Sequence, residues 1–156
     1  MTPAKTIKNL QKGFTLIELL VVIGILAILL AIVLIAINPA RQFAQANDTK
    51  RRSDVNAILN GIDQYAADHS GNLPAGIPQA PAAAVDIKSA AGGADICAAL
   101  VTKYIAAMPV DPKTGSWTDC TTYDTKYNVL QAAGGDNRVT VSTVSELDGT
   151  PIAVTR

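Results

Sequence analysis

Side chains that commonly perform catalysis are few in this sequence and lie far apart. The single histidine, His69, has no cysteine near it in the sequence and no acidic partner at a spacing typical of a catalytic pair. Cys97 and Cys120 are not in C-x-x-C spacing, so the sequence predicts neither a redox motif nor a four-ligand zinc site. It also contains no glycine-rich phosphate or dinucleotide motif and no His-x-x-x-His pair. We therefore expect a protein without enzymatic activity or cofactor, with His69 on the surface at a helix end.

One carboxylate, Glu18, lies inside a long apolar run. Residues 14–37 are 24 residues with no other charged side chain. As a helix the run would be about 36 Å long, against about 30 Å for the hydrocarbon core of a bilayer. A carboxylate near the end of such a helix costs about 2.5–3.5 kcal/mol on insertion scales and needs a partner. These features exclude an ordinary soluble globular domain and predict a membrane-spanning helix.

Charges before the apolar run predict how the chain is oriented. The 156 residues include 13 basic and 13 acidic side chains, so electrostatic binding to nucleic acid is not indicated. Lys5, Lys8 and Lys12 precede the run without any acidic residue, which favours a cytoplasmic N-terminus and an exported C-terminal region. A signal peptide has an apolar stretch of about 7–15 residues and a small-x-small cleavage site. The run here is longer and lacks that site, so we expect it to be retained.

The residues from Lys12 to Val22, KGFTLIELLVV, resemble the class III leader of type IV pilins and pseudopilins. The resemblance implies that a prepilin peptidase cleaves between Gly13 and Phe14 and that Phe14 is then N-methylated. Removing 13 residues from 156 leaves 143, and removing three lysines from 13 basic and 13 acidic side chains leaves a formal charge of −3. The resemblance also implies a pilin fold, in which a small sheet packs on a long helix.

The resemblance gives Glu18 a role in assembly. Cleavage creates an amine at Phe14, and the resemblance implies that Glu18 pairs with the terminal amine of a neighbouring subunit and so fixes the axial stagger. Alternatively, Glu18 reaches the lipid headgroups or pairs with the amine of its own chain. We favour the role between subunits because the whole leader motif surrounds this glutamate.

Small side chains form a narrow stripe along the apolar helix. Gly24, Ala27 and Ala31 are spaced at i, i+3 and i+7, which in an apolar medium lets another helix approach closely. The helix therefore suits the core of a helical filament as well as lipid. Pro39 cannot donate a backbone hydrogen bond to Ile35, so we expect a kink or a loosened turn at the membrane exit.

Beyond Pro39 the helix is expected to continue to His69, 56 residues from Phe14, because apolar residues recur at helical spacing. These residues are Phe43, Val55, Ile58, Leu59, Ile62 and Tyr65. The cluster Lys50-Arg51-Arg52 is either a nucleic-acid patch or a charged, solvated helix shoulder that packs against subunits. We favour the shoulder, with Asp48 pairing with Arg51 or Arg52.

Residues 74–94 are rich in Ala, Pro and Gly and have no clear period, so they predict a surface loop. A short helix capped by Asp95 and ended by Pro109 should follow, and then a turn at residues 111–115. The helix would present one apolar face formed by Ile96, Leu100, Tyr104 and Met108.

Apolar and polar residues alternate over residues 123–129 and again over residues 139–143. Gly134-Gly135-Asp136-Asn137 lies between the two runs, so together they predict a β-hairpin. Residues 152–154 predict a third strand. The apolar side of these strands would pack on the outer half of the long helix, giving an α+β fold with a small antiparallel sheet as its head. This agrees with the pilin fold that the leader implies.

Residues 104–115, YIAAMPVDPKTG, together with residues 123–127, also resemble the C-terminal part of major pseudopilins, some of which bind calcium in this region. Asp111, Asp119 and Asp124 are weak calcium candidates. They form no regular pattern of oxygen ligands, so we expect solvated loop carboxylates and no metal.

Cys97 and Cys120 enclose 22 residues in the region expected to be exported. A disulfide persists there, and loop entropy gives it about 3 kcal/mol of stabilisation. We therefore expect a structural disulfide that clamps the short helix to the loop before the sheet.

The predicted parts are a cleaved leader at residues 1–13, a transmembrane or filament-core helix at 14–37, an amphipathic outer half of the helix at 38–70 and a globular head at 71–156. The resemblance implies a structural pilin that polymerises through its N-terminal helix into a type IV pilus-like extracellular filament. One alternative is a pseudopilin of a type II secretion or DNA-uptake system. Another is an unprocessed single-pass membrane-anchored binding module.

The resemblance also implies partners and a location. The partners would be further copies of the chain in a helical homopolymer, the prepilin peptidase, the inner-membrane assembly platform and minor pilins. Before assembly the subunit would span the cytoplasmic membrane once with its N-terminus in the cytoplasm, and afterwards it would lie in a filament on the cell surface.

Overall fold

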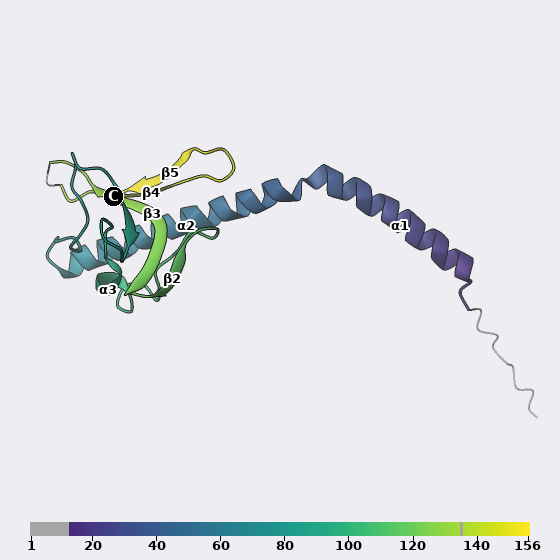
Figure 1. The fold of residues 1–156 in the computed structure, drawn as a ribbon, viewed down its shortest axis with the longest axis horizontal. Helices are drawn as coiled ribbons and strands as arrows, with labels where there is room; N and C mark the ends of the chain where they lie inside the picture. Colours follow the sequence, from purple (N-terminus) through teal and green to yellow (C-terminus); the bar gives the residue numbers. More distant parts are fainter. Residues whose placement is uncertain (1–12, 135) are drawn as a thin grey trace, which may run out of the picture. The chain divides into compact units, whose positions relative to one another are not determined.

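The computed structural model describes residues 13–134 and 136–156, which fall into two compact units. The first unit ends at Pro39, and the second, the C-terminal unit, comprises Ala40–Arg156. The elements in chain order are α1 (Leu16–Ile37), α2 (Pro39–Asp68), β1 (Val85–Lys88), α3 (Cys97–Leu100), β2 (Ser116–Asp119), β3 (Thr122–Gln131), β4 (Val139–Val144) and β5 (Pro151–Thr155) (Figure 1). Apart from Gly13, the expected leader lies outside the described residues. The expected α+β architecture is confirmed.

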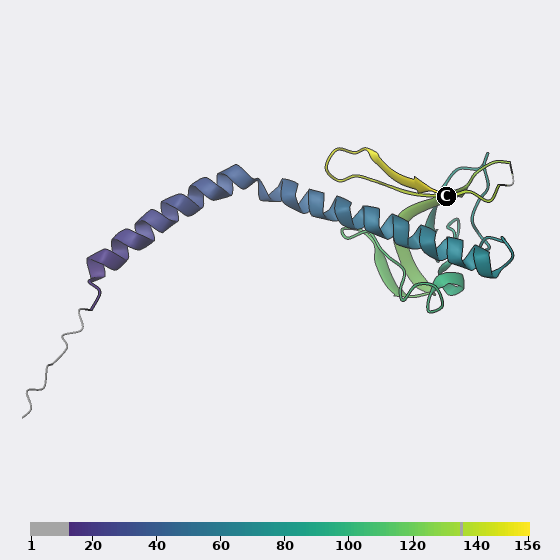
Figure 2. The ribbon, with the colours of Figure 1, turned by 180° about the vertical axis from the view of Figure 1, so that it is seen from behind.

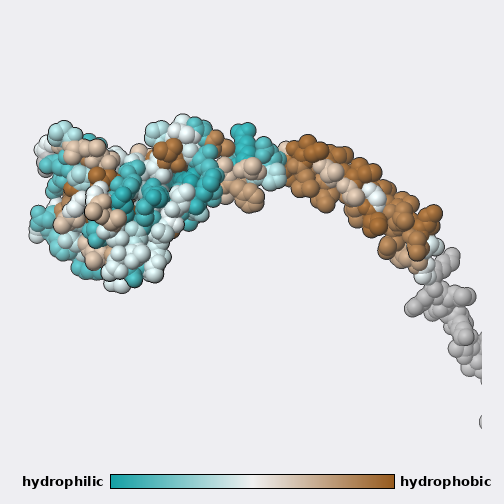
Figure 3. All heavy atoms as spheres, in the orientation of Figure 1, coloured by the Kyte–Doolittle hydropathy of each residue, from teal (hydrophilic) through white to brown (hydrophobic). Residues whose placement is uncertain are grey.

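Helix α1 is apolar on every side, and none of its 22 residues is buried. Its length and composition are sufficient to cross a membrane. Figure 3 shows this helix as a nearly continuous hydrophobic surface, whereas the visible face of the C-terminal unit is mostly hydrophilic. A helix that is apolar all round has no preferred core-facing side, so its surroundings must be apolar in every direction.

The expected single helix from Phe14 to His69 is instead two helices that are separated at Asn38. The backbone of Asn38 has φ of 46°, in the left-handed region, and α2 begins at the next residue, Pro39. A proline disfavours helical backbone at the residue before it, and asparagine tolerates the left-handed region better than most residues. Proline is also well suited to the first position of a new helix. A kink or a loosened turn was predicted at Pro39. Its position is confirmed, but the structure has a complete break between two helices there.

Helix α2 supplies one side of the core of the C-terminal unit. Val55, Ile58, Leu59 and Ile62 are fully buried, and Tyr65 packs at the edge of the same cluster. The apolar face that the sequence predicted is therefore confirmed over these residues. Phe43 belongs to the same predicted face but is exposed. The reason is that the first two turns of α2 extend beyond the residues that the sheet covers.

The sheet packs against one side of α2 (Figures 1 and 2). Its strand order is β1-β3-β4-β5, with β2 also paired to β3, and every pairing is antiparallel. Tyr123, Thr125, Tyr127 and Val129 alternate inward along β3, as the sequence predicted. The predicted hairpin is β3–β4, paired from Asn128↔Ser142 to Gln131↔Val139, and the predicted third strand is β5. Gly135 of its connection lies outside the described residues.

Two short strands were not predicted. Strand β1 lies within residues 74–94, which were predicted to be a surface loop. Strand β2 follows the turn at residues 111–115. Each has only four residues. A strand this short offers too few alternations to stand out from its surroundings, and its pairing with β3 is what stabilises it.

The helix expected to begin after Asp95 is also much shorter than predicted. Helix α3 ends at Leu100, because the backbone of Val101 is extended and that of Thr102 has φ of 74°, in the left-handed region. Asp95 does not cap it. The hydroxyl of Tyr123 accepts hydrogen bonds from the N–H groups of Ile96 and Cys97 at 3.1 and 3.3 Å, and donates to Asp95 Oδ1 at 2.7 Å. A side chain from β3 thus takes the capping role.

Candidate functional site

The predicted cleavage junction lies just before α1. Gly13, Phe14 and Thr15 have no regular secondary structure, and α1 begins at Leu16. The Phe14 side chain is exposed. The peptide bond between Gly13 and Phe14 is therefore outside the helical hydrogen-bond ladder. Lys12, the other residue of the junction, lies outside the described residues.

Thr15 and Glu18 form a capping box at the start of α1. The Glu18 N–H donates to Thr15 Oγ1 at 3.2 Å, and Glu18 Oε2 accepts from both Thr15 N–H at 2.9 Å and Thr15 Oγ1 at 2.8 Å. The box fixes the carboxylate at the first turn of the helix, one turn from the junction. Sequence inspection found Glu18 but missed Thr15, although Thr-x-x-Glu before an apolar run is the signature of this cap.

A shallow apolar hollow surrounds this carboxylate on the surface of α1. It is lined by Phe14, Ile17, Glu18, Val21 and Val22. Among the described residues that line it, Glu18 alone has an ionisable side chain. The arrangement offers one anionic group within an apolar rim, which suits a cation attached to an apolar group.

Gly24, Ala27 and Ala31 are exposed, like every other residue of α1. No atom lies within 4 Å of a Cβ built on Gly24, so the described residues leave open space beside it. A helix from another molecule could approach closely along this stripe.

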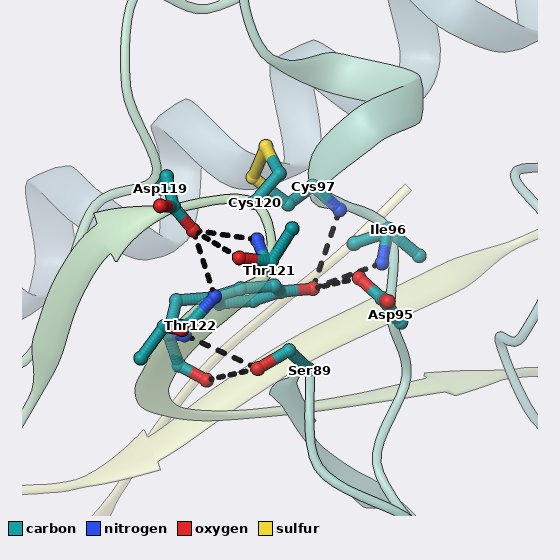
Figure 4. Close-up of a disulfide and its surroundings, with 9 residues drawn as sticks. Ser89, Asp95, Ile96, Cys97, Asp119, Cys120, Thr121 and Thr122 are labelled. Atoms are coloured by element: carbon teal, nitrogen blue, oxygen red, sulfur yellow. Dashed lines mark hydrogen bonds between the residues drawn. A yellow bond between two sulfur atoms is a disulfide. The ribbon is translucent and has the colours of Figure 1, made fainter.

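In the C-terminal unit, Cys97 and Cys120 form a disulfide, as the sequence predicted. Cys97 begins α3, and Cys120 lies in the connection between β2 and β3 (Figure 4). Asp119 Oδ1, at the end of β2, accepts hydrogen bonds from Thr121 in the same connection and from Thr122 at the start of β3. The disulfide therefore joins the short helix to the β2–β3 connection within the sheet, and the expectation that it reaches a loop before the sheet is wrong because β2 precedes Cys120.

A buried ionic network crosses the C-terminal unit. Arg51 Nε donates to Asp111 Oδ2 at 2.5 Å, and Arg51 Nη1 pairs with Asp48 Oδ1 at 2.8 Å and Glu146 Oε2 at 3.4 Å. Arg51, Asp48 and Asp111 are all buried. The expectation of a solvated Lys50-Arg51-Arg52 shoulder is therefore wrong for Arg51, whose guanidinium joins α2 to two distant loops.

Asp48 holds the β4–β5 loop against α2. Its carboxylate accepts hydrogen bonds from Ser145 Oγ at 2.6 Å, Glu146 N–H at 2.7 Å and Leu147 N–H at 3.2 Å. Burial alone would raise the pKa of Asp48, but the hydrogen bonds from Ser145, Glu146 and Arg51 together hold that pKa well below its usual range. Asp48 is thus an ionised side chain inside the fold.

Asp111 and Arg51 stabilise each other's charged forms. The hydrogen bond to Asp111 is the largest cause that raises the pKa of Arg51. Burial would raise the pKa of Asp111, but Arg51 and the N–H groups of Thr114 and Lys113 lower it to about 2. The buried charges are therefore paired as well as hydrogen-bonded, as their removal from water requires.

The three weak calcium candidates do not come together. Asp111 is bound to Arg51 and is buried, so the expectation of a solvated loop carboxylate is wrong for this residue. Asp119 accepts from Thr121 and Thr122, and Asp124 pairs with Lys126 at 2.6 Å. Within residues 13–134 and 136–156, no three His, Cys, Asp or Glu side chains are placed to hold a metal ion.

His69 lies just after the end of α2. Its ring stacks on Tyr65 at a centroid distance of 3.8 Å, and its Nδ1–H donates to the Tyr65 carbonyl oxygen at 2.7 Å. The side chain is exposed, as expected. Its contacts are those of a helix-terminal residue.

Residues 8–34 match the family model for the prokaryotic N-terminal methylation motif. The match covers the Gly13–Phe14 junction, the Thr15–Glu18 capping box and most of α1. Searches of curated proteins and of solved structures gave no significant match. The predicted class III leader of type IV pilins and pseudopilins is therefore confirmed. The leader motif and the apolar helix α1 are those of a pilin-like substrate with a membrane anchor.

Proposed function

We propose that the mature chain is the structural subunit of a type IV pilus-like extracellular filament. The observation that carries this proposal is that α1, most of which lies within the methylation motif, has no buried residue. Its apolar side chains need a lipid environment first and cover from other helices later, since leaving them in water is costly. A helical homopolymer supplies that cover from identical helices.

The arrangement around Glu18 supports a role in subunit addition. Cleavage between Gly13 and Phe14 would create an ammonium group carried by an apolar residue. The hollow around Glu18 matches both properties, with a carboxylate and an apolar lining. In this proposal the Phe14 amine of one subunit pairs with Glu18 of its neighbour, while Gly24, Ala27 and Ala31 allow close helix packing.

The location and partners follow from the same proposal. The subunit spans the cytoplasmic membrane once, with its basic leader in the cytoplasm, until the prepilin peptidase removes the leader. An inner-membrane assembly platform and minor pilins then act with further copies of the chain to extrude the filament. The C-terminal unit lies outside the membrane throughout, where its disulfide is stable.

The test uses cells from which the gene for this chain has been deleted. The full-length chain is expressed in these cells, and filaments are sheared from their surface. We expect sheared filaments whose subunit has the intact mass of residues 14–156 with one added methyl group. Cryo-electron microscopy should show α1 in the filament core. A Gly13→Val variant, whose bulkier side chain disfavours cleavage, should keep its leader in the membrane fraction and give no filaments.

Other outcomes identify the alternatives. A processed and methylated subunit without surface filaments, whose loss blocks protein secretion or DNA uptake, would indicate a pseudopilin. A chain that still carries Lys12 in the membrane fraction of wild-type cells would indicate an unprocessed membrane-anchored binding module.

A further inference from the structure

Phe43, at the start of α2, is an apolar residue that the C-terminal unit leaves uncovered. It is 71% exposed, more than any other large hydrophobic residue described in that unit. It is also outside the hydrophobic cluster that contains Val55 and Ile58. A single exposed apolar residue is ordinary on a protein surface, so its position in the chain must decide whether it has a partner.

Phe43 is close along the chain to the end of the membrane-spanning helix. Helix α1 ends at Ile37, and only Asn38 separates it from α2. Two Cα–Cα steps and one helical turn put the Cα of Phe43 at most about 14 Å from that of Ile37, whatever the orientation of the two units. The backbone of Asn38, with φ of 46° and ψ of 80°, is not extended, so the separation is below this limit.

The length of α1 places its end at the surface of a bilayer. Its 22 residues span about 33 Å, slightly more than the hydrocarbon core of about 30 Å. The headgroup layer beyond the core is about 5–7 Å thick on each side. Side chains of a helix point toward its N-terminus, so the Phe43 ring is directed toward the end of α2 that joins α1. The ring is therefore within reach of the headgroup layer.

The residues around Phe43 suit that layer. Residues 38–47 include one basic side chain, Arg41, and no acidic one, and the first acidic residue after Glu18 is Asp48. A segment without carboxylates meets no repulsion from anionic lipid phosphates. Figure 3 shows that the hydrophobic surface of α1 gives way to hydrophilic surface where α2 begins. An aromatic ring among polar residues just outside an apolar span is typical of an anchor at the membrane interface.

We propose that, before assembly, the start of α2 lies in the headgroup layer of the membrane, with the Phe43 ring at the edge of the hydrocarbon core. The partner of this side chain is thus the lipid surface that α1 leaves. A second anchor at this end of α1 fixes how deeply the helix is inserted while the subunit waits for assembly. This inference rests on the membrane-spanning α1 of the proposed function and adds a lipid contact made by α2.

The test measures the depth of residue 43 by fluorescence. Trp117 is the only tryptophan of the chain, so Trp117→Phe gives a background without tryptophan, into which Phe43→Trp is introduced. The full-length chain is reconstituted in vesicles of phosphatidylcholine and phosphatidylglycerol. These vesicles contain a lipid brominated either near the headgroup end of its acyl chain or near the chain terminus. We expect the shallow bromine to quench residue 43 at least about twofold more strongly than the deep one.

Two further positions calibrate the measurement in the same background. Leu26 lies near the middle of α1, so Leu26→Trp should be quenched most strongly by the deep bromine. Ala67 is exposed near the far end of α2, so Ala67→Trp should be quenched by neither lipid.

Alkylation supplies a readout of the phenylalanine itself. Ala40 is exposed and lies three positions before Phe43, on the same face of α2. The thiol of Ala40→Cys should react with a membrane-impermeant maleimide at least about threefold faster when Phe43→Ser is also present, because loss of the ring releases the start of α2 from the headgroup layer. Gln45→Ser is the matched control. It changes an exposed residue two positions from Phe43, on the opposite side of the helix, and should leave the rate unchanged.

Two results would overturn the inference. One is that the shallow bromine does not quench residue 43 more strongly than the deep one, while residue 26 is quenched by the deep one. The other is that alkylation is equally fast with and without Phe43→Ser. Either result leaves α1 in the membrane and the proposed function standing. If residue 26 is also unquenched, α1 does not span the bilayer, and the membrane anchor of the proposed function is rejected together with this inference.

Discussion

Arg51 Nε donates a hydrogen bond to Asp111 Oδ2 across 2.5 Å, although 60 residues separate them in the sequence. Both side chains are buried. The same guanidinium pairs with Asp48, which holds the β4–β5 loop. One arginine on α2 therefore joins the helix to the turn before β2 and to the last hairpin of the sheet.

Replacing Arg51 by Met should lower the free energy of unfolding by about 3–5 kcal/mol, because it leaves the carboxylates of Asp48 and Asp111 buried without their cation. The methionine fills much of the volume, so the loss is mainly electrostatic. Thermal unfolding of the full chain in detergent, followed by circular dichroism, measures it. Arg52→Met is the control, since Arg52 is exposed and should cost less than about 0.5 kcal/mol. If Arg51→Met and Arg52→Met lowered the free energy of unfolding equally, the ionic network would not stabilise the fold.

Acid should weaken the fold through Asp111. Its carboxyl has a pKa of about 2 in the folded chain against an ordinary value of 3.8, so folding favours the ionised form. Its contribution is present in full above about pH 4 and is lost as the pH falls through 2. The shift corresponds to about 2 kcal/mol. Unfolding by urea at pH 5 and pH 2 should show a smaller acid-induced loss for Asp111→Asn than for the wild type. Parallel losses would show that this carboxyl does not contribute.

The sequence predicted those parts of the fold that follow a strong local pattern. The unbroken apolar run at residues 14–37 specified a helix in apolar surroundings, and the alternation in β3 and β4 specified both their pairing and their buried face. The break at Asn38 was expected only as a kink, because proline alone does not decide between bending a helix and starting a new one.

The pairing of Asp48 with Arg51 was predicted and is confirmed, but the rest of the ionic network was missed because Asp111 and Glu146 come from distant parts of the chain. A signal was nevertheless present in α2, where Asp48 and Arg51 continue the spacing of Val55, Ile58 and Ile62 toward the N-terminus. Charged residues in register with an apolar face indicate buried, paired charges. No residue near Asp111 in the sequence identifies Arg51 as its partner, because the pair forms only when the segment before β2 lies against α2.

Loss of the disulfide should destabilise the C-terminal unit. A Cys97→Ser, Cys120→Ser double variant should lose about 3 kcal/mol of unfolding free energy, since the unfolded chain regains the freedom of the enclosed loop. Reductant should destabilise the wild type similarly and leave the double variant unchanged. Nonreducing peptide mapping of surface material supplies the direct test. Recovery of both cysteines as alkylatable thiols from undenatured protein would rule out the bond there.

Glu18 should couple processing to polymerisation, because its partner amine exists only after cleavage. Glu18→Ala removes both the carboxylate and its half of the capping box with Thr15. It should still insert and be cleaved, since removing a charge eases insertion and leaves the Gly13–Phe14 junction intact. We expect few or no filaments when this variant is the only copy. Membrane-fraction subunit and sheared filament are compared in the same cells.

Glu18→Gln separates the two roles of the carboxylate. Glutamine can complete the capping box with Thr15, so the start of α1 should be preserved, but an amide cannot neutralise a buried ammonium. If the charge matters, this variant should assemble little better than Glu18→Ala, whereas Thr15→Ser, which keeps both the hydroxyl and the carboxylate, should assemble normally. Wild-type filament yield from Glu18→Ala with normal processing would make Glu18 a tolerated charge at the membrane edge. The axial stagger would then have to come from side-chain packing along Gly24, Ala27 and Ala31.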